Sequence, residues 1–200
     1  MKTIPTFTDE IILENDRVKL IPLEASHLEL LEKYAIQEPE LWTYSLQSGA
    51  GTENMKKYIQ AALSDREKGV SYPFIVFDKQ TNEWAGSTRF YDYQPVHQTV
   101  QLGYTWYGKK FHGTGLNKNC KFLILDFAFD QLQLERVEFR ADNNNARSIA
   151  AMKSIGCVPE GVLRSNCTDG QIRRDSIVLS ILKSEWYNDV KTNLLNRISG

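Results

Sequence analysis

The residues between 109 and 121 combine side chains and backbone freedom that suit the binding of a phosphate group. This segment, KKFHGTGLNKNCK, contains four lysines and one histidine but no acidic residue. Gly113 and Gly115 can turn the chain sharply and present backbone N–H groups without a Cβ in the way. A helix is predicted to begin here, and free N–H groups at the positive end of a helix attract anions. We therefore predict a phosphate or pyrophosphate site; glycines that only start a helix, with solvated lysines around them, are the simpler alternative.

The same segment lacks the signatures of the common nucleotide-binding loops. Gly108 and Gly113 have the spacing of a Walker A loop, but Thr114 and Gly115 stand where lysine and serine or threonine are required. The GxGxxG fingerprint of dinucleotide-binding folds is also absent. We therefore expect backbone amides to hold the anion, and a kinase-like nucleotide enzyme is the least favoured interpretation.

The segment is predicted to join a strand to the longest helix of the chain. Residues 99–107 read as a strand, and residues 114–132 place apolar side chains on most sides of a helix. Residues 136–142 read as the next strand. A strand–helix–strand crossover makes its two strands parallel, so a parallel pair is expected at the phosphate site.

The remaining elements are predicted from caps, periodicity and turns. Ser26 and Glu29 have the spacing of a capping box, and Thr52 can cap a second helix. Asp169-Gly170 is a strong hairpin signal, so antiparallel hairpins are expected on both sides of the crossover. The other predicted strands are 17–23, 71–79, 83–93, 157–167 and 173–182, and the other predicted helices are 26–37, 52–69, 146–155 and 184–198.

The composition is that of one soluble domain spanning residues 1–200. Lysine plus arginine number 24 and aspartate plus glutamate 25, a balance that argues against a nucleic-acid binder. The start of the chain lacks the apolar stretch of a signal peptide, and the most apolar run, CKFLILDFAF, is too short to cross a membrane. The three cysteines form no CxxC pair. We therefore expect reduced thiols, a cytoplasmic protein and no metal site.

Two motifs now carry a resemblance to a known family. The stretch from Lys110 to Gly115 resembles the Q/R-x-x-G-x-G/A pyrophosphate loop of the GNAT superfamily of acyl-CoA-dependent N-acetyltransferases. Residues 143–164, NNNARSIAAMKSIGCVPEGVLR, resemble its second motif, N-x-x-S followed by a helix and a glycine-initiated strand. Further residues resemble one branch of this superfamily, the branch that contains the ribosomal-protein N-acetyltransferases. They are Gly161-Val162-Leu163-Arg164, Asp169-Gly170, Arg173, Asp175 and Ser184-Glu185-Trp186.

The resemblance covers residues 12–190 in element order and is densest between 100 and 186. It implies an α/β fold with a mostly antiparallel, twisted sheet of about seven strands, flanked by helices around a central parallel β-α-β unit. It also implies acetyl-CoA as co-substrate, with the pyrophosphate on the glycine loop and the pantetheine arm along the 99–107 strand. The cofactor-binding residues predicted in this way are Leu102, Gly103, Tyr104, Lys110, Phe111, His112, Gly113, Thr114, Gly115, Leu116, Asn117, Asn145 and Ser148.

Two of these positions have a second interpretation, and a third departs from the family pattern. Gly103 marks either a bulge whose amides polarise the thioester or a space for an aromatic neighbour such as Trp106. Asn145 is a helix N-cap or a pantetheine ligand, and the two roles are compatible. Lys110 replaces the family's usual glutamine or arginine and lacks the planar fork of arginine.

The resemblance suggests Ser148 as the proton donor to the departing thiolate and Glu138 as the base that deprotonates the amine. Ser148 could instead cap its helix, and Glu138 could pair with Arg140 on a solvated strand face. Met152 stands where many members have the tyrosine that protonates the thiolate, so that mechanism is not carried over. Gln101 stands where related sequences often have glutamate, and it cannot accept a proton.

No residue is clearly identified as the general base, and this favours an acceptor amine that loses its proton easily. An α-amine titrates near 7.7–8.0 and a lysine near 10.4, which is a difference of ~3.4 kcal/mol in deprotonation. We therefore expect direct acetyl transfer to an N-terminal α-amine, of a protein or of a small aminoacyl compound, with a homodimer compatible with this function. The alternative from another class is a non-catalytic sensor that binds an acyl-CoA or a nucleotide.

Overall fold

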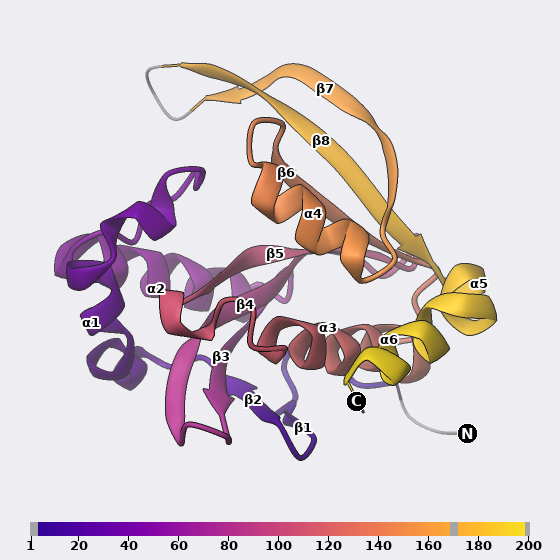
Figure 1. Cartoon of the computed structure of the whole chain (residues 1–200), viewed down its shortest axis with the longest axis horizontal. Coiled ribbons are helices and arrows are strands. Elements are labelled where there is room, and N and C mark those ends of the chain that lie inside the picture. The colour runs from indigo at the N-terminus through magenta and orange to yellow at the C-terminus, as the bar shows by residue number, and fades with distance from the viewer. Residues whose placement is uncertain (1–3, 169–171, 199–200) are drawn as a thin grey trace.

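An eight-stranded sheet lies at the centre of the computed structural model, which describes residues 4–168 and 172–198 (Figure 1). The strand order is β1-β2-β3-β4-β5-β6-β8-β7, and β5 with β6 is the parallel pair. The predicted mixed sheet with its parallel unit is confirmed, and the short β1 is an addition to it. The strands are β1 Leu13–Glu14, β2 Val18–Pro22, β3 Tyr72–Asp78, β4 Glu83–Gln94, β5 Thr99–Tyr107, β6 Arg136–Asp142, β7 Val158–Thr168 and β8 Arg173–Leu182.

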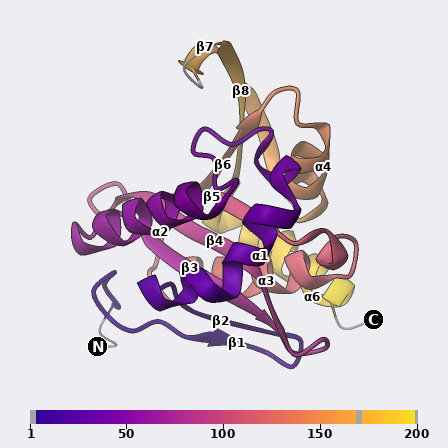
Figure 2. The same ribbon diagram turned by 90° about the vertical axis from the view of Figure 1, so that its left-hand side faces the viewer.

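Helices cover both faces of the sheet. The helices α1 and α2 lie on one side of strands β3 to β5, and α3 with α6 lies on the other (Figures 1 and 2). The residues from Tyr72 to Val76 in β3 are all buried, as expected for a strand covered on both faces. The helices are α1 Leu28–Gln37, α2 Thr52–Glu67, α3 Leu116–Asp126, α4 Ala146–Ser154, α5 Lys183–Glu185 and α6 Lys191–Ile198, with π-helical turns at Phe127–Gln131 and Trp186–Val190.

The start of α1 differs from the predicted capping box. A short 3-10 turn over Ala25–His27 precedes the helix, and Ser26 lies inside this turn. The backbone N–H of Glu24 donates to Nδ1 of His27 at 3.0 Å and closes the turn. The predicted cap at Ser26 is therefore wrong, because a histidine three residues after Glu24 supplies the acceptor.

The start of α2 also differs from its predicted cap. Thr52 is the first helical residue, and Gly51, with a φ of +81°, occupies the cap position. The Thr52 hydroxyl donates to a carboxylate oxygen of Glu32 on α1. The predicted cap at Thr52 is wrong because its hydroxyl joins two helices and does not satisfy the first turn.

The sheet opens between its two parallel strands. Strand β5 pairs with β6 only from Thr99 to Gln101, opposite Arg136 to Glu138. Beyond this point β5 continues beside β4, and β6 continues beside β8. Figure 1 shows β6, β7 and β8 curving away from the other strands, with α4 between the two parts. The amides in the second half of β5 therefore lack a β6 partner.

A β-bulge lies beside this opening. Thr88 of β4 faces two residues of β5, Tyr104 and Thr105, because the pairing register of the two strands shifts here. Tyr104 has a φ of +48°, which is rare for a residue with a side chain. Bulges bend a strand and change the direction of its groups, and they are common beside active sites.

The C-terminal strands β7 and β8 form the predicted antiparallel pair. Their predicted turn, Asp169-Gly170, lies outside the described residues. In the described part of the chain, the helices are too short or too polar to cross a lipid bilayer.

Candidate functional site

A cavity of about 770 Å³ occupies the opening between β5 and β6. The second half of β5 forms one wall, and the first half of α3 and residues from Arg147 to Ser154 of α4 form another. Residues of the loop after α1 and of strands β7 and β8 complete the enclosure. Most residues predicted to bind the cofactor line this one cavity, which places the loop, the strand and the second motif around the same space.

The glycine loop adopts the conformation that its sequence predicts. Gly113 and Gly115 have φ values of +76° and +86°, and a Cβ at either position would meet nothing within 4 Å. Gly115 is also the N-cap residue of α3. The positive φ values are strained for residues with a Cβ, so glycine is required here by the backbone and not by crowding. The open space above the loop leaves room for a ligand.

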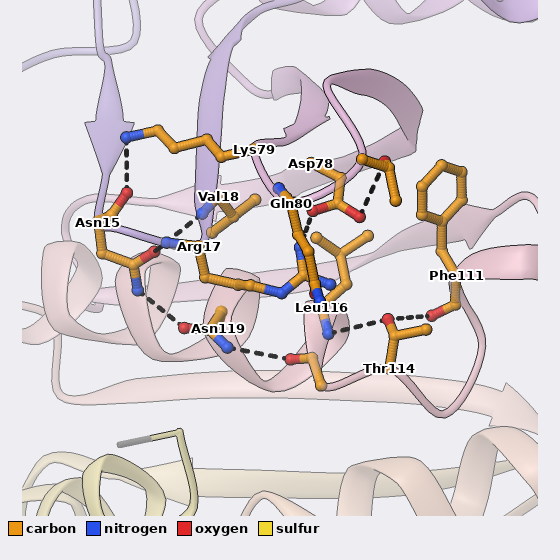
Figure 3. Close-up of polar contacts among 12 residues, drawn as sticks. Asn15, Arg17, Val18, Asp78, Lys79, Gln80, Phe111, Thr114, Leu116 and Asn119 are labelled. Atoms are coloured by element: carbon orange, nitrogen blue, oxygen red, sulfur yellow. Dashed lines mark hydrogen bonds and ion pairs between the residues drawn. The ribbon is translucent and has the colours of Figure 1, made fainter. Parts of the chain in front are cut away.

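Side-chain hydrogen bonds hold this loop in place (Figure 3). The Thr114 hydroxyl donates to the carbonyl of Phe111 at 2.9 Å. The Asn119 amide donates to the carbonyl of Gly115 at 3.2 Å and accepts from the side chain of Asn15 at 2.9 Å. The loop is therefore held by a local turn and by the β1–β2 connection, which preorganises its amides.

Basic side chains surround the loop. Lys118 and Arg147 line the cavity together with His112. The Nε2–H of His112 donates to the carbonyl of Tyr107 at 2.9 Å, which leaves Nδ1 to accept from Arg147 at 3.2 Å. Among the described residues that line the cavity there is no aspartate or glutamate. The charge of the site therefore suits an anionic ligand.

Lys110 takes a different place from the one that the family pattern suggests. Its ammonium group pairs with the carboxylate of Glu83, and Lys110 is absent from the cavity lining. Hydrogen bonds from Lys110 and Lys33 lower the pKa of Glu83 below its usual value. Leu116 is buried and Thr114 is turned toward Phe111, so these residues shape the loop from outside the cavity.

The β5 wall presents backbone groups at the opening of the sheet. Leu102, Gly103, Tyr104 and Thr105 line the cavity, and the pairing of β5 with β6 has already ended at this point. A Cβ on Gly103 would lie 2.9 Å from the ring of Tyr91. Gly103 therefore makes room for an aromatic ring, which is Tyr91 and not Trp106, and it also directly precedes the bulge.

The second motif forms the opposite wall through α4. The Asn145 side chain accepts from the backbone N–H of Ser148 at 3.0 Å and caps α4. Asn145, Ser148 and Met152 all line the cavity. The cap role is therefore present, and it leaves Asn145 positioned at the ligand space. Ser148 contributes its backbone N–H to the cap, so its hydroxyl is not used there.

We expect Asn145→Ser to separate the two roles of this residue. Serine caps helices about as well as asparagine, so the free energy of unfolding should change by less than about 0.5 kcal/mol. Serine lacks the side-chain amide that is proposed to contact the ligand. The affinity for coenzyme A should therefore fall roughly tenfold through loss of a hydrogen bond. Calorimetric titration and urea unfolding of the same variant measure both quantities. Unchanged affinity would restrict Asn145 to its capping role.

Glu138 lies apart from the cavity lining. Its carboxylate pairs with Arg136 at 2.8 Å and with Arg140 at 2.7 Å. Arg136 also pairs with Glu160 on β7, which contributes most to lowering the pKa of Glu160 to about 2. The predicted alternative, a Glu138–Arg140 pair, is present in the structure, while Arg140 itself lines the cavity.

The structure thus brings together ten of the predicted residues and adds others. The predicted residues that line the cavity are Leu102, Gly103, Tyr104, Phe111, His112, Gly113, Gly115, Asn117, Asn145 and Ser148. Lys121 and Arg174 also line it, although neither was predicted. Lys121 reads in the sequence as one of several lysines near a helix start, and Arg174 lies between two residues of the family resemblance, Arg173 and Asp175, without being part of it. A local pattern could not identify either, because each reaches the cavity through tertiary packing.

Comparisons with known proteins show the family and the fold of the chain. Residues 17–158 match the family model described as acetyltransferase (GNAT) domain. A Bacillus subtilis protein named "Putative ribosomal N-acetyltransferase YdaF" is 24% identical over 185 residues, covering 88% of this chain and 96% of the relative. Among solved structures, a GCN5-related N-acetyltransferase from Brucella melitensis has the same fold, with a TM-score of 0.88 at 23% identity over 99% of this chain and 89% of that one.

A second solved structure shares the fold. Mycobacterium smegmatis RimJ in complex with CoA-disulfide has a TM-score of 0.79 at 17% identity, covering 94% of this chain and 93% of that one. The family match spans most of the sequence and includes β5, the glycine loop, α3 and α4. The protein belongs to the GNAT family of acyl-CoA-dependent N-acetyltransferases.

Proposed function

We propose that this enzyme transfers the acetyl group of acetyl-CoA directly to the α-amine of a protein N-terminus or of a small aminoacyl compound. The observation that carries this proposal is the cavity that joins the glycine loop to the part of β5 beyond its pairing with β6. The loop and its basic neighbours suit a pyrophosphate, and the distance along β5 suits an extended arm. CoA-disulfide is bound by the RimJ relative, which supports the same class of ligand.

The reaction that this geometry supports needs no covalent enzyme intermediate. The neutral amine attacks the thioester carbon, and amides of residues 102–105 stabilise the oxyanion that forms. The C–S bond then breaks, and the thiolate receives a proton from the Ser148 hydroxyl, while the proton that the attacking amine loses passes through water and restores that hydroxyl. Burial raises the pKa of the Cys120 thiol to about 11, which makes this cysteine a poor nucleophile.

The surroundings of Glu138 favour an α-amine as acceptor. Its carboxylate is held between two arginines and does not line the cavity, so we assign it no direct contact with the amine. Without a strong base, the acceptor must be neutral in water for a useful fraction of the time. An α-amine meets this requirement at neutral pH, and a lysine side chain does not. The word "ribosomal" in the name of the YdaF relative supports a protein acceptor.

A pair of matched peptides tests the acceptor class. One peptide has a free N-terminus and no lysine, and the other has a blocked N-terminus and one lysine in the same sequence context. The gap of about 2.5 pKa units predicts a roughly 100-fold higher kcat/KM for the free N-terminus at pH 7.5. Release of CoA thiol gives the rate, and mass spectrometry locates the acetyl group. Faster modification of the lysine would contradict the proposal, and binding of acetyl-CoA without turnover on any amine would favour the sensor.

A further inference from the structure

A buried lysine lies beneath the bulge of β5. Lys121, in the middle of α3, is only 5% exposed and lines the cavity. Its Nζ donates to the Thr105 hydroxyl at 2.8 Å and to the Thr88 hydroxyl at 3.2 Å. The two hydroxyls also lie 2.8 Å from each other. One ammonium group and two threonines thus form a closed triangle between α3, β4 and β5.

This triangle occupies the place where the backbone ladder is interrupted. Thr88 faces Tyr104 and Thr105 together, because the register of β4 and β5 shifts at this point. A bulge leaves a residue without its regular pairing, so side-chain contacts must hold its shape. Lys121 connects the two strands across the shift. Because Tyr104 has a φ of +48°, the bulge is a strained feature whose exact shape depends on the side chains around it.

Among the described residues, Lys121 forms no ion pair with a carboxylate. The titratable groups that act on it are the thiols of Cys120, beside it on α3, and Cys157, at the turn after α4. Burial raises the pKa of both thiols, so both are neutral at neutral pH. The groups facing it from β4 and β5 are the uncharged hydroxyls of Thr88 and Thr105. A buried charge without a counter-ion costs stability, and burial lowers the pKa of Lys121 to about 8.

A residue that destabilises the fold and borders a reactive cavity calls for a functional reason. We propose that Lys121 is a positioning residue for acetyl transfer, whose ammonium form holds the β5 bulge in shape and places a positive charge beneath the amides that face the thioester. This inference rests on the proposed function. The charge acts through the bulge on the oxyanion, and no proton leaves Lys121 during the reaction. It follows that the enzyme should be most active while Lys121 is protonated.

The variant Lys121→Met removes the charge and keeps a chain of similar length. Thr88 and Thr105 can still bond to each other, so the fold loses a buried charge without leaving both hydroxyls unpaired. Folding lowers the pKa of Lys121 from 10.5 to about 8, so between pH 8 and pH 10.5 the unfolded chain binds more protons than the folded chain. The cost of the buried charge is therefore fully present below pH 8. At pH 7 we expect the Tm of Lys121→Met to rise by roughly 5 °C.

The same variant should lose activity while it gains stability. We expect kcat to fall on the order of 10- to 100-fold, less than for a direct oxyanion donor, with the KM for acetyl-CoA changed less than about threefold. Lys57→Met is the matched control, because Lys57 is an exposed lysine on α2 outside the cavity lining. It should leave kcat and Tm unchanged. A Lys121→Met enzyme with normal kcat, or one that loses stability together with kcat, would overturn the proposal.

The pH dependence provides a readout that a purely structural role would not change. The ratio of wild-type kcat to Lys121→Met kcat cancels the titration of the acceptor, since both enzymes use the same amine. This ratio should fall toward 1 as the pH rises from 7 through about 8 to 10, because the wild type loses its ammonium form. A constant ratio over this range would refute a role for the charge. If the wild type itself acetylates no α-amine, the proposed function fails first, and the ratio is then measured with whichever amine is accepted.

Discussion

Gly115→Glu should weaken the binding of coenzyme A by at least about 100-fold, through repulsion between the new carboxylate and the pyrophosphate. Gly115 lies at the N-cap of α3, lines the cavity and has a φ of +86°. A Cβ at this position would meet nothing within 4 Å, so the glutamate has room to extend from the loop into the space proposed for the pyrophosphate. The substitution also costs about 1 kcal/mol in the backbone, because the left-handed conformation disfavours residues with a Cβ.

Gly51→Glu is a closely matched control for this experiment. Gly51 is the N-cap of α2, has a φ of +81° and has open space where a Cβ would lie, but it is outside the cavity lining. Both variants should therefore lose similar stability in urea unfolding, and only Gly115→Glu should lose affinity in calorimetric titration with coenzyme A. Equal affinities of Gly115→Glu and wild type would show that the phosphates bind somewhere else.

The backbone conformation of the glycine loop could be predicted because it is specified locally. Two glycines before a helix specify left-handed backbone and free amides within a few residues, and no distant partner is needed to form them. The structure places both Gly113 and Gly115 as expected. The parallel pairing of β5 and β6 could also be predicted, since a crossover through a helix leaves no other direction for the second strand.

The predicted helix caps were less successful, because a capping side chain can bind more than one partner. Ser26 and Thr52 have the right spacing for helix caps, but His27 and Glu32 supply the contacts that decide the local geometry. Glu32 lies on the neighbouring helix, so its effect on Thr52 cannot be seen in a short window of sequence. Capping preferences are worth only about 1 kcal/mol, and a tertiary contact of similar strength can override them.

The residues that the sequence could not identify are those whose environment is assembled by the whole fold. Lys121 follows Lys118 at helical spacing and looks like a second surface lysine. It is nevertheless buried, and it donates to Thr88 and Thr105 at the register shift between β4 and β5, which no pattern in either strand predicts. For Glu138 the sequence suggested a role that its surroundings do not favour. The family resemblance proposes this strand glutamate as the base, but its carboxylate pairs with Arg136 and Arg140.

The β4–β5 pair itself should be very sensitive to a single methyl group at Gly86. A Cβ there would lie 2.1 Å from the carbonyl oxygen of Trp106 and 2.8 Å from the Cα of Tyr107. Both neighbours are backbone atoms of β5, so no side-chain rotation can relieve the contact. Gly86→Ala must push the two strands apart, and we expect it to lower the free energy of unfolding by about 3 kcal/mol.

Gly161→Ala is the matched control, because Gly161 also lies within a strand, β7, and a Cβ there meets nothing within 4 Å. It should be neutral or slightly stabilising, by up to about 1 kcal/mol, since alanine restricts the unfolded chain more than glycine does. Urea unfolding of both variants measures the difference. The bulge at Thr88 lies only two residues from Gly86, so Gly86→Ala should also reduce kcat in the protein that remains folded at low temperature. Stability equal to that of Gly161→Ala would mean that β4 and β5 are not packed as closely as this register requires.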